Sequence, residues 1–236
     1  IGELIIKEKL PINNVCYTNS YESILYNIQQ SKNAQMIFEI DVIKIKDSFI
    51  IAHDGKESLY DYDGSFCDIM LEKYNGLKVA GKYTPMNFDL LNDIMLQFPN
   101  IIFNLDIKEK NSNYNDAITF ICDKLHNNLH NIVPQIYTVD DIKICTSMGF
   151  TKFIVGIWKF YDDIYSQNSI QFIELIQLVP NIQIMGFSID YKHNEHNEQF
   201  HKIQNIITSN IYFHGQGKIS ANTIKQYNEN NIYFFI

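Results

Sequence analysis

Alternating apolar and polar residues predict a strand over residues 36–43. Phe38, Ile40 and Val42 fall on one face of this strand, and Glu39 and Asp41 fall on the other, because successive side chains of a strand point to opposite faces. Two adjacent carboxylates in an otherwise apolar strand repel each other and resist burial. A cation between them would make the pair tolerable, and so would a strand end that opens to water.

A second apolar run follows a short polar turn and leads directly to a histidine. Residues 49–52 are Phe-Ile-Ile-Ala, and His53 and Asp54 come next. Two carboxylates that could hold a metal and a histidine that could transfer a proton, all within one hairpin-sized segment, favour a hydrolytic site. The alternative interpretation is a strand end with solvated acids and a surface histidine.

Strands and helices alternate along the rest of the chain. Further strands are predicted over 4–7, 101–107, 133–137, 152–159, 182–189, 211–214 and 232–235. Helices are predicted from Asn19 or Ser20 to Gln30 and over 84–96, 114–129, 139–148, 168–178, 195–209 and 220–229. This alternation is typical of a parallel sheet.

The number of repeats predicts an α/β fold of the (β/α)8 TIM barrel type, in a single domain over residues 1–236. Eight strands separated by helices in about this length are typical of such a barrel. An open, doubly wound sheet is the alternative, but no glycine-rich phosphate turn follows an early strand. Residues 54–83 are too long for an ordinary connection, so we expect an insertion loop or lid there, after the second strand.

Functional residues of a (β/α)8 barrel lie at the carboxyl ends of its strands. Asn104, Asp106 and Lys108 alternate with apolar residues at the end of the strand over 101–107, which repeats the layout of Glu39 and Asp41. Three carboxylates from neighbouring strands would supply the oxygen ligands that Mg2+ or Ca2+ prefers. Glu39, Asp41 and Asp106 are therefore the candidate metal ligands.

Phosphate chemistry would use the groups around such a metal. Lys108, two residues beyond Asp106, would reach a phosphate bound to the metal, and His53 would donate or accept a proton at the scissile P–O bond. The metal would neutralise charge on the phosphoryl oxygens.

Three later residues are further candidates for the rim. Trp158, the single tryptophan, lies where a substrate could stack, although packing within the rim explains it equally well. Lys159 is either a second phosphate contact or a solvated strand end. His214 either lines the pocket or is a hydrogen-bonded rim residue.

Charge and cysteine content narrow the class of partner and the compartment. The 236 residues carry a net charge of −8 and include no arginine, so the chain would repel nucleic acid and anionic lipid. A small-molecule substrate is expected instead. Four cysteines without paired spacing indicate reduced thiols and a cytoplasmic location. No apolar run approaches the ~20 residues of a transmembrane segment.

Four segments together resemble the glycerophosphodiester phosphodiesterases and their sphingomyelinase D-like relatives. These segments follow the order and approximate spacing of the family, and they are Tyr17–Ser23, Phe38–Val42, His53–Asp54 and Asn104–Lys108. The resemblance implies a phosphodiesterase barrel that cleaves a glycerophosphodiester or a phospholipid-type headgroup bond.

The resemblance also implies roles for individual residues. Glu39, Asp41 and Asp106 would bind a divalent cation, Lys108 would contact phosphate, and His53 would be one of two catalytic histidines. The segment 54–83 would be the family's insertion over the mouth of the site.

One element of the family pattern is missing from this chain. The family places a histidine at the end of the first strand, where this chain has Lys7 or a near neighbour, and no histidine precedes His53. Lys7 would serve as a catalytic group if burial lowered its pKa. Otherwise the chain is a degenerate barrel that binds a metal and a phosphorylated or sugar ligand without turnover.

Overall fold

The computed structural model describes residues 3–4, 16–17, 19–30, 37–53, 60–108, 112–157, 167–190, 207, 210–214 and 232–235. The chain divides into two compact units, one of residues 1–133 with residue 236 and one of residues 134–235. Whether these form the predicted single domain stays a prediction. No helix among the described residues has the length and apolar character needed to cross a lipid bilayer.

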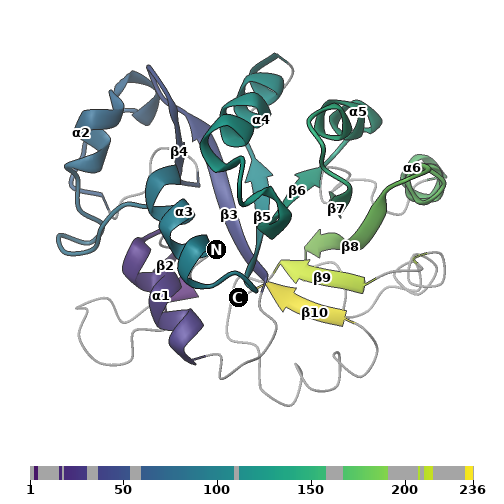
Figure 1. The fold of residues 1–236 in the computed structure, drawn as a ribbon, viewed down its shortest axis with the longest axis horizontal. Helices are drawn as coiled ribbons and strands as arrows, with labels where there is room; N and C mark the ends of the chain where they lie inside the picture. Colours follow the sequence, from purple (N-terminus) through teal and green to yellow (C-terminus); the bar gives the residue numbers. More distant parts are fainter. Residues whose placement is uncertain are drawn as a thin grey trace. The chain divides into compact units, whose positions relative to one another are not determined.

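Strand β3 (Ile37–Lys44) is the centre of the sheet in the first unit (Figure 1). It pairs in parallel with β5 (Ile102–Ile107) and antiparallel with β4 (Phe49–Ile51). The parallel register places Glu39 beside Asn104 and Asp41 beside Asp106. These pairings confirm the predicted strands over 36–43, 49–52 and 101–107. The polar residues that recur in the two parallel strands lie side by side.

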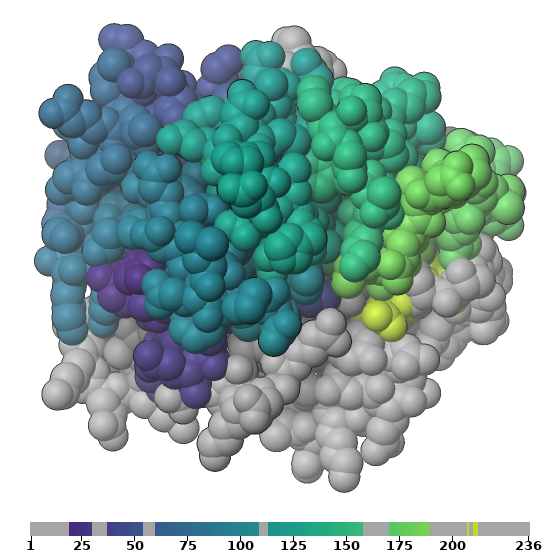
Figure 2. Space-filling view, viewed as in Figure 1, coloured from purple at the N-terminus to yellow at the C-terminus, as the bar shows by residue number. Residues whose placement is uncertain are grey.

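Three helices of the first unit correspond to predicted helices. They are α1 (Tyr21–Gln30), α3 (Phe88–Gln97) and α4 (Ser112–Leu125), and a short 3-10 helix, η2 (Leu129–Asn131), follows α4. Phe88 of α3 meets Phe120 of α4 edge to face, with ring centroids 5.4 Å apart. In Figure 2 the residues of α3 and α4, in teal, form adjoining parts of the same surface.

Helix α3 begins later than predicted, because its cap is Asn87 and not Thr84. The Asn87 side chain accepts a hydrogen bond of 2.9 Å from the Leu90 backbone N–H, which satisfies a donor that a helix start leaves open. The N–H and hydroxyl of Thr84 instead donate to the Glu22 carboxylate, at 2.8 Å each. The predicted start at residue 84 is therefore wrong.

The described part of the predicted first strand belongs to a separate two-stranded sheet. Strand β1 (Glu3–Leu4) pairs antiparallel with β2 (Cys16–Tyr17), with Leu4 opposite Cys16. The parallel partner that the prediction assumed for residues 4–7 is therefore not the partner of Leu4. Residues 5–7, including Lys7, lie outside the described part of the chain.

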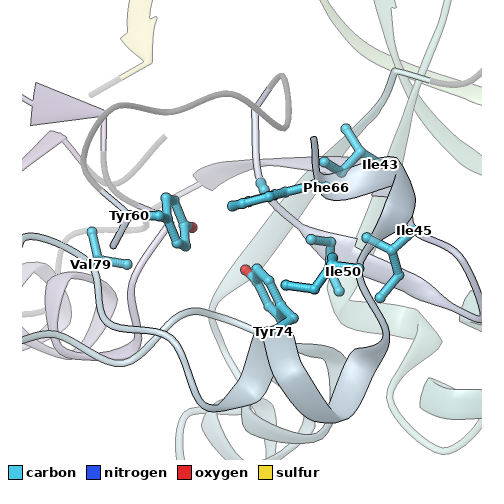
Figure 3. Packing of buried hydrophobic residues seen from close by; sticks show 9 residues of the cluster. Ile43, Ile45, Ile50, Tyr60, Phe66, Tyr74 and Val79 are labelled. Carbon is cyan, nitrogen blue, oxygen red and sulfur yellow. The ribbon is translucent and has the colours of Figure 1, made fainter. Parts of the chain in front are cut away.

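The insertion is folded, with its own helices and an aromatic core. It contains the 3-10 helix η1 (Phe66–Asp68) and α2 (Leu71–Asn75), and residues 54–59 are not described. Figure 3 shows the rings of Tyr60, Phe66 and Tyr74 turned toward one another beside Ile50 of β4. We define this group, with Ile43, Ile45, Ala52, Ile69 and Val79, as the insertion core. The predicted insertion after the second strand is thus folded over residues 60–83, and its role as a lid stays a prediction.

The insertion core rests on the β3–β4 hairpin through polar contacts as well. The hydroxyl of Tyr74, which is fully buried, lies 3.1 Å from both the Ile51 and the Met86 carbonyl oxygens. At the hairpin turn, the Asp47 carboxylate accepts a 2.9 Å hydrogen bond from the Leu71 N–H. The hairpin that carries the acidic residues is thus one wall of the insertion.

The second unit is a parallel sheet with helices between its strands. The strands pair in the order β6 (Ile132–Ile136), β7 (Lys152–Gly156), β8 (Gln183–Asp190), β9 (Asn210–His214) and β10 (Ile232–Phe235). Helix α5 (Val139–Ser147) connects β6 to β7, and α6 (Gln167–Gln177) connects β7 to β8. These elements confirm the predicted strand–helix alternation, while the helices predicted over 195–209 and 220–229 lie outside the described residues.

We expect Tyr74→Phe to destabilise the protein by about 1–2 kcal/mol, because the buried carbonyl oxygens of Ile51 and Met86 lose the single O–H donor that they share. Urea denaturation followed by circular dichroism measures the free energy of unfolding. Tyr26→Phe is the matched control, since Tyr26 is 46% exposed, and it should change stability little. Equal stability of the two variants would contradict the role of the Tyr74 hydroxyl.

Candidate active site

Three buried carboxylates converge between β3 and β5. Glu39 and Asp41 come from β3 and Asp106 comes from β5, and one oxygen of each lies within 4.8 Å of the others. Their exposed fractions are 1%, 1% and 2%. We call Glu39, Asp41 and Asp106 the acidic triad. Burial to this degree overturns the alternative interpretation of solvated acids at a strand end.

Lys108 lies immediately beyond β5 and bridges two members of the acidic triad. Its Nζ is 2.8 Å from Asp41 Oδ1 and 2.5 Å from Asp106 Oδ2. Its backbone N–H donates to the Val42 carbonyl oxygen at 2.9 Å, which continues the β3–β5 pairing. Because the side chain is 26% exposed, the ammonium lies between the buried acids and the surface of the unit.

Burial and charge act differently on the three groups. Burial raises the pKa of Glu39 well above its ordinary value, and the charges of Asp41 and Asp106 raise it further. Burial also acts to raise the pKa of Asp41, but the charge and hydrogen bond of the Lys108 ammonium, together with the other positive charges nearby, outweigh burial and the pKa is lowered. Burial would lower the pKa of Lys108, yet Asp41 and Asp106 together raise it. Lys108 therefore stabilises the charge of Asp41 more effectively than that of Glu39.

His53 is brought to the triad by the hairpin. The N–H of Ala52, just past β4, donates to the Asp41 carbonyl oxygen at 3.0 Å, so the next residue follows directly from a pairing with β3. The positive charge of His53 contributes to lowering the pKa of Asp41. The half-buried His53 is thus within electrostatic range of the acidic triad.

Asn19 is a residue at this site that sequence reasoning assigned to another role. It was expected, with Ser20 as the alternative, to cap α1. Its Nδ2 instead lies 3.5 Å from Asp41 Oδ2, and neither Asn19 Oδ1 nor Ser20 Oγ has a hydrogen-bond partner among the described residues. An asparagine before a helix has the same local signature whether it caps the helix or faces a site. Only the segment Tyr17–Ser23, as part of the family resemblance, could have drawn attention to it.

Nothing in the described part of the chain places the remaining candidate residues beside the acidic triad. Lys7, Trp158 and Lys159 lie outside the described residues, and β7 ends at Gly156, before the predicted 159. His214 is the last residue of β9, where its backbone pairs with Asp190. The roles expected for these four residues stay predictions.

The donor set fits a hard divalent cation. All three triad ligands are carboxylate oxygens, which Mg2+ and Ca2+ prefer. Three carboxylates with one ammonium leave an excess of negative charge in a buried place, which a divalent cation would reduce. A metal-bound phosphate beside a lysine and a histidine is an arrangement that can hydrolyse a phosphodiester.

Comparison with known proteins finds similarity in three-dimensional structure. No protein-family model matches the sequence, and no curated protein matches it either. A phosphodiesterase from Oleispira antarctica, solved in complex with the product sn-glycerol-3-phosphate, has a similar structure, with a TM-score of 0.66 and 15% identity over 92% of this chain and 86% of that chain.

Two further structures are a glycerophosphoryl diester phosphodiesterase from Parabacteroides distasonis and a glycerophosphodiester phosphodiesterase from Thermotoga maritima. The first has a TM-score of 0.66 and 14% identity over 92% of this chain and 76% of that chain. The second has a TM-score of 0.61 and 16% identity over 92% and 87%. This chain has the glycerophosphodiester phosphodiesterase fold.

The glycerophosphodiester phosphodiesterase fold confirms the predicted α/β class and (β/α)8 barrel. It also supports the family resemblance that the four sequence segments indicated, since those segments carry the acidic triad, Lys108 and His53. At identities of 14–16%, what is shared is the fold, and the chemistry rests on this chain's own residues.

We expect Lys108→Met to destabilise the protein by about 2–4 kcal/mol in the presence of a chelator, because two buried carboxylates lose their counter-ion. The partial exposure of Lys108 keeps the effect below that of a fully buried pair. Chemical denaturation at neutral pH in EDTA measures the change. The chelator prevents a cation from replacing the lysine.

Lys44→Met is the matched control for this experiment. Lys44 forms a more exposed ion pair, 3.9 Å from Asp116, and such pairs contribute about 0–1 kcal/mol. If both lysine variants lost the same small amount of stability, Lys108 would not be the counter-ion of the buried acids.

Proposed function

We propose that this chain is a metal-dependent phosphodiester hydrolase that cleaves a glycerophosphodiester or a related phospholipid-type headgroup bond. The observation that carries the proposal is the buried acidic triad bridged by Lys108. It occurs in a chain with the fold of glycerophosphodiester phosphodiesterases, one of which was solved with sn-glycerol-3-phosphate.

In this proposal Glu39, Asp41 and Asp106 hold one Mg2+ or Ca2+ ion. When bound, the cation supplies charge neutralisation at the phosphoryl oxygens. The three carboxylates would hold the cation at one place, because one oxygen of each lies within 4.8 Å of the others. Burial of the triad keeps water from competing for the bound ion.

Lys108 and His53 act on the substrate itself. The partly exposed Lys108 ammonium contacts a non-bridging phosphate oxygen. Its positive charge, which lies against Asp41 and Asp106 in the structure, is then shared with the phosphate. His53 transfers a proton at the scissile P–O bond. Lys7 is proposed as the second proton-transfer group, and Trp158 and Lys159 as substrate contacts.

A second candidate function follows from the first strand. No histidine precedes His53 in the sequence, so the proton-transfer pair lacks one histidine. The alternative is a degenerate barrel that binds a metal and a phosphorylated or sugar ligand without cleaving it. We also propose a reducing, cytoplasmic environment, with Cys67 and Cys122 as thiols.

We expect the wild-type protein to cleave glycerophosphocholine-type diesters when Mg2+ or Ca2+ is present and to lose this activity in EDTA. Asp106→Asn should abolish metal-dependent turnover, and His53→Ala should lower kcat by about 10²–10⁴-fold, the usual contribution of an acid–base group. Phosphorus NMR of the products gives the rates and shows which ester bond breaks.

Asp116→Asn is the matched control, because Asp116 is an exposed acid of α4. Its activity should equal that of the wild type. Wild-type protein that binds the metal but cleaves no diester of the panel would favour the binding-module alternative, and activity created by Lys7→His would strengthen it. A wild type that neither binds a divalent cation nor cleaves any diester would refute both candidates.

A further inference from the structure

The two carboxylate oxygens of Asp41 face different partners. Oδ1 faces the Lys108 ammonium at 2.8 Å, and Oδ2 faces the side-chain amide of Asn19, with Nδ2 at 3.5 Å. We propose that Asn19 is a positioning residue, which sets the orientation of the Asp41 carboxylate toward a divalent cation. This inference rests on the proposed function, since it concerns the same metal site.

Asn19 is a neutral donor in a place where a charged donor would compete with the cation. The Lys108 ammonium, with its full positive charge, already contacts Oδ1 of Asp41. An amide N–H on the other oxygen opposes rotation of the carboxylate without adding charge. Groups that orient a ligand in this way commonly contribute about 10–100-fold to metal affinity.

The burial of Asn19 supports a role at the site. Asn19 is 4% exposed, and its Oδ1 has no hydrogen-bond partner among the described residues. A buried amide oxygen without a partner costs free energy, about 1–3 kcal/mol. Polar groups of this kind in native proteins call for an explanation, such as a functional role or a bound ion or water.

The backbone of Asn19 is fixed by the segment that ends the insertion. Its carbonyl oxygen accepts the Met86 N–H at 3.0 Å, and the Tyr21 N–H donates to the Thr84 carbonyl oxygen at 3.0 Å. Ser20 lies between them in an antiparallel bridge with Pro85. Hydrogen bonds therefore hold the backbone on both sides of this position, and they fix the point from which the Asn19 side chain extends.

Glu22, in the first turn of α1, stabilises this pairing. Its carboxylate accepts both the N–H and the hydroxyl of Thr84, at 2.8 Å each. Met86 on the same segment also has its carbonyl oxygen 3.1 Å from the Tyr74 hydroxyl of the insertion core. Glu22 thus acts on Asp41 only through the backbone of Asn19, as a second positioning residue.

Binding of Mn2+ tests the proposal without reference to turnover. Titration calorimetry gives the affinity, and electron paramagnetic resonance of bound Mn2+ reports the symmetry of its ligands. We expect Asn19→Ala to weaken Mn2+ binding by about 10-fold or more and to change the spectrum of the bound ion. Glu22→Ala should weaken binding by a smaller factor, roughly threefold, with a change in the same direction.

Asn27→Ala is the matched control for both variants. Asn27 is an amide within α1, and it donates to the Ser23 carbonyl oxygen at 2.9 Å, so its loss perturbs the helix without touching the acidic triad. Its Mn2+ affinity and spectrum should equal those of the wild type. A loss of affinity in this control equal to that of Asn19→Ala would show a general effect of weakening α1 and would overturn the proposal.

Failure of the inference can be told apart from failure of the proposed function. If the wild type binds Mn2+ and folded Asn19→Ala binds it equally well with the same spectrum, Asn19 does not position Asp41. If the wild type binds no Mn2+, the metal site itself is wrong. Should Asn19→Ala not fold, Glu22→Ala decides, because it removes the acceptor of both Thr84 donors and leaves the triad and the Asn19 side chain unchanged. Unchanged affinity and spectrum in this variant would overturn the proposal.

Discussion

The bridge that Lys108 makes between Asp41 and Asp106 is the interaction on which the first unit depends. Parallel pairing of β3 and β5 in register forces the two carboxylates to be neighbours in a buried place. Burying like charges side by side is unfavourable unless a positive charge lies within a few ångströms. Lys108 supplies that charge from the first residue after β5, so the sheet and the charged cluster are compatible.

The hairpin and the insertion together support this charged cluster. The β3–β4 hairpin contributes two acids and His53, and its apolar residues form one wall of the insertion core. The insertion ends in the segment that holds the backbone at Asn19. A side chain such as Tyr74, which contacts both the hairpin and that segment, therefore bears on the geometry of the acids without approaching them.

The strands and the acidic triad could be predicted from the sequence because both depend on short-range alternation. Once Asp41 and Asp106 were placed at equivalent points of neighbouring parallel strands, their proximity followed. The start of α3 and the role of Asn19 could not be predicted in this way. Both depend on pairing between residues far apart in the sequence, such as Thr84 with Glu22, and local patterns carry no record of such partners.

The contacts around Asn19 also bear on the order in which the protein folds. The contact from Asn19 to Asp41 spans 22 residues, and the one from Glu22 to Thr84 spans 62. Closing such loops costs entropy that local helices and hairpins do not pay. We therefore expect the arrangement of Asp41 to be completed late, after α1, the hairpin and the insertion have each formed. A cation that requires this arrangement would bind the fully folded unit in preference to any partly folded form, and so would stabilise it.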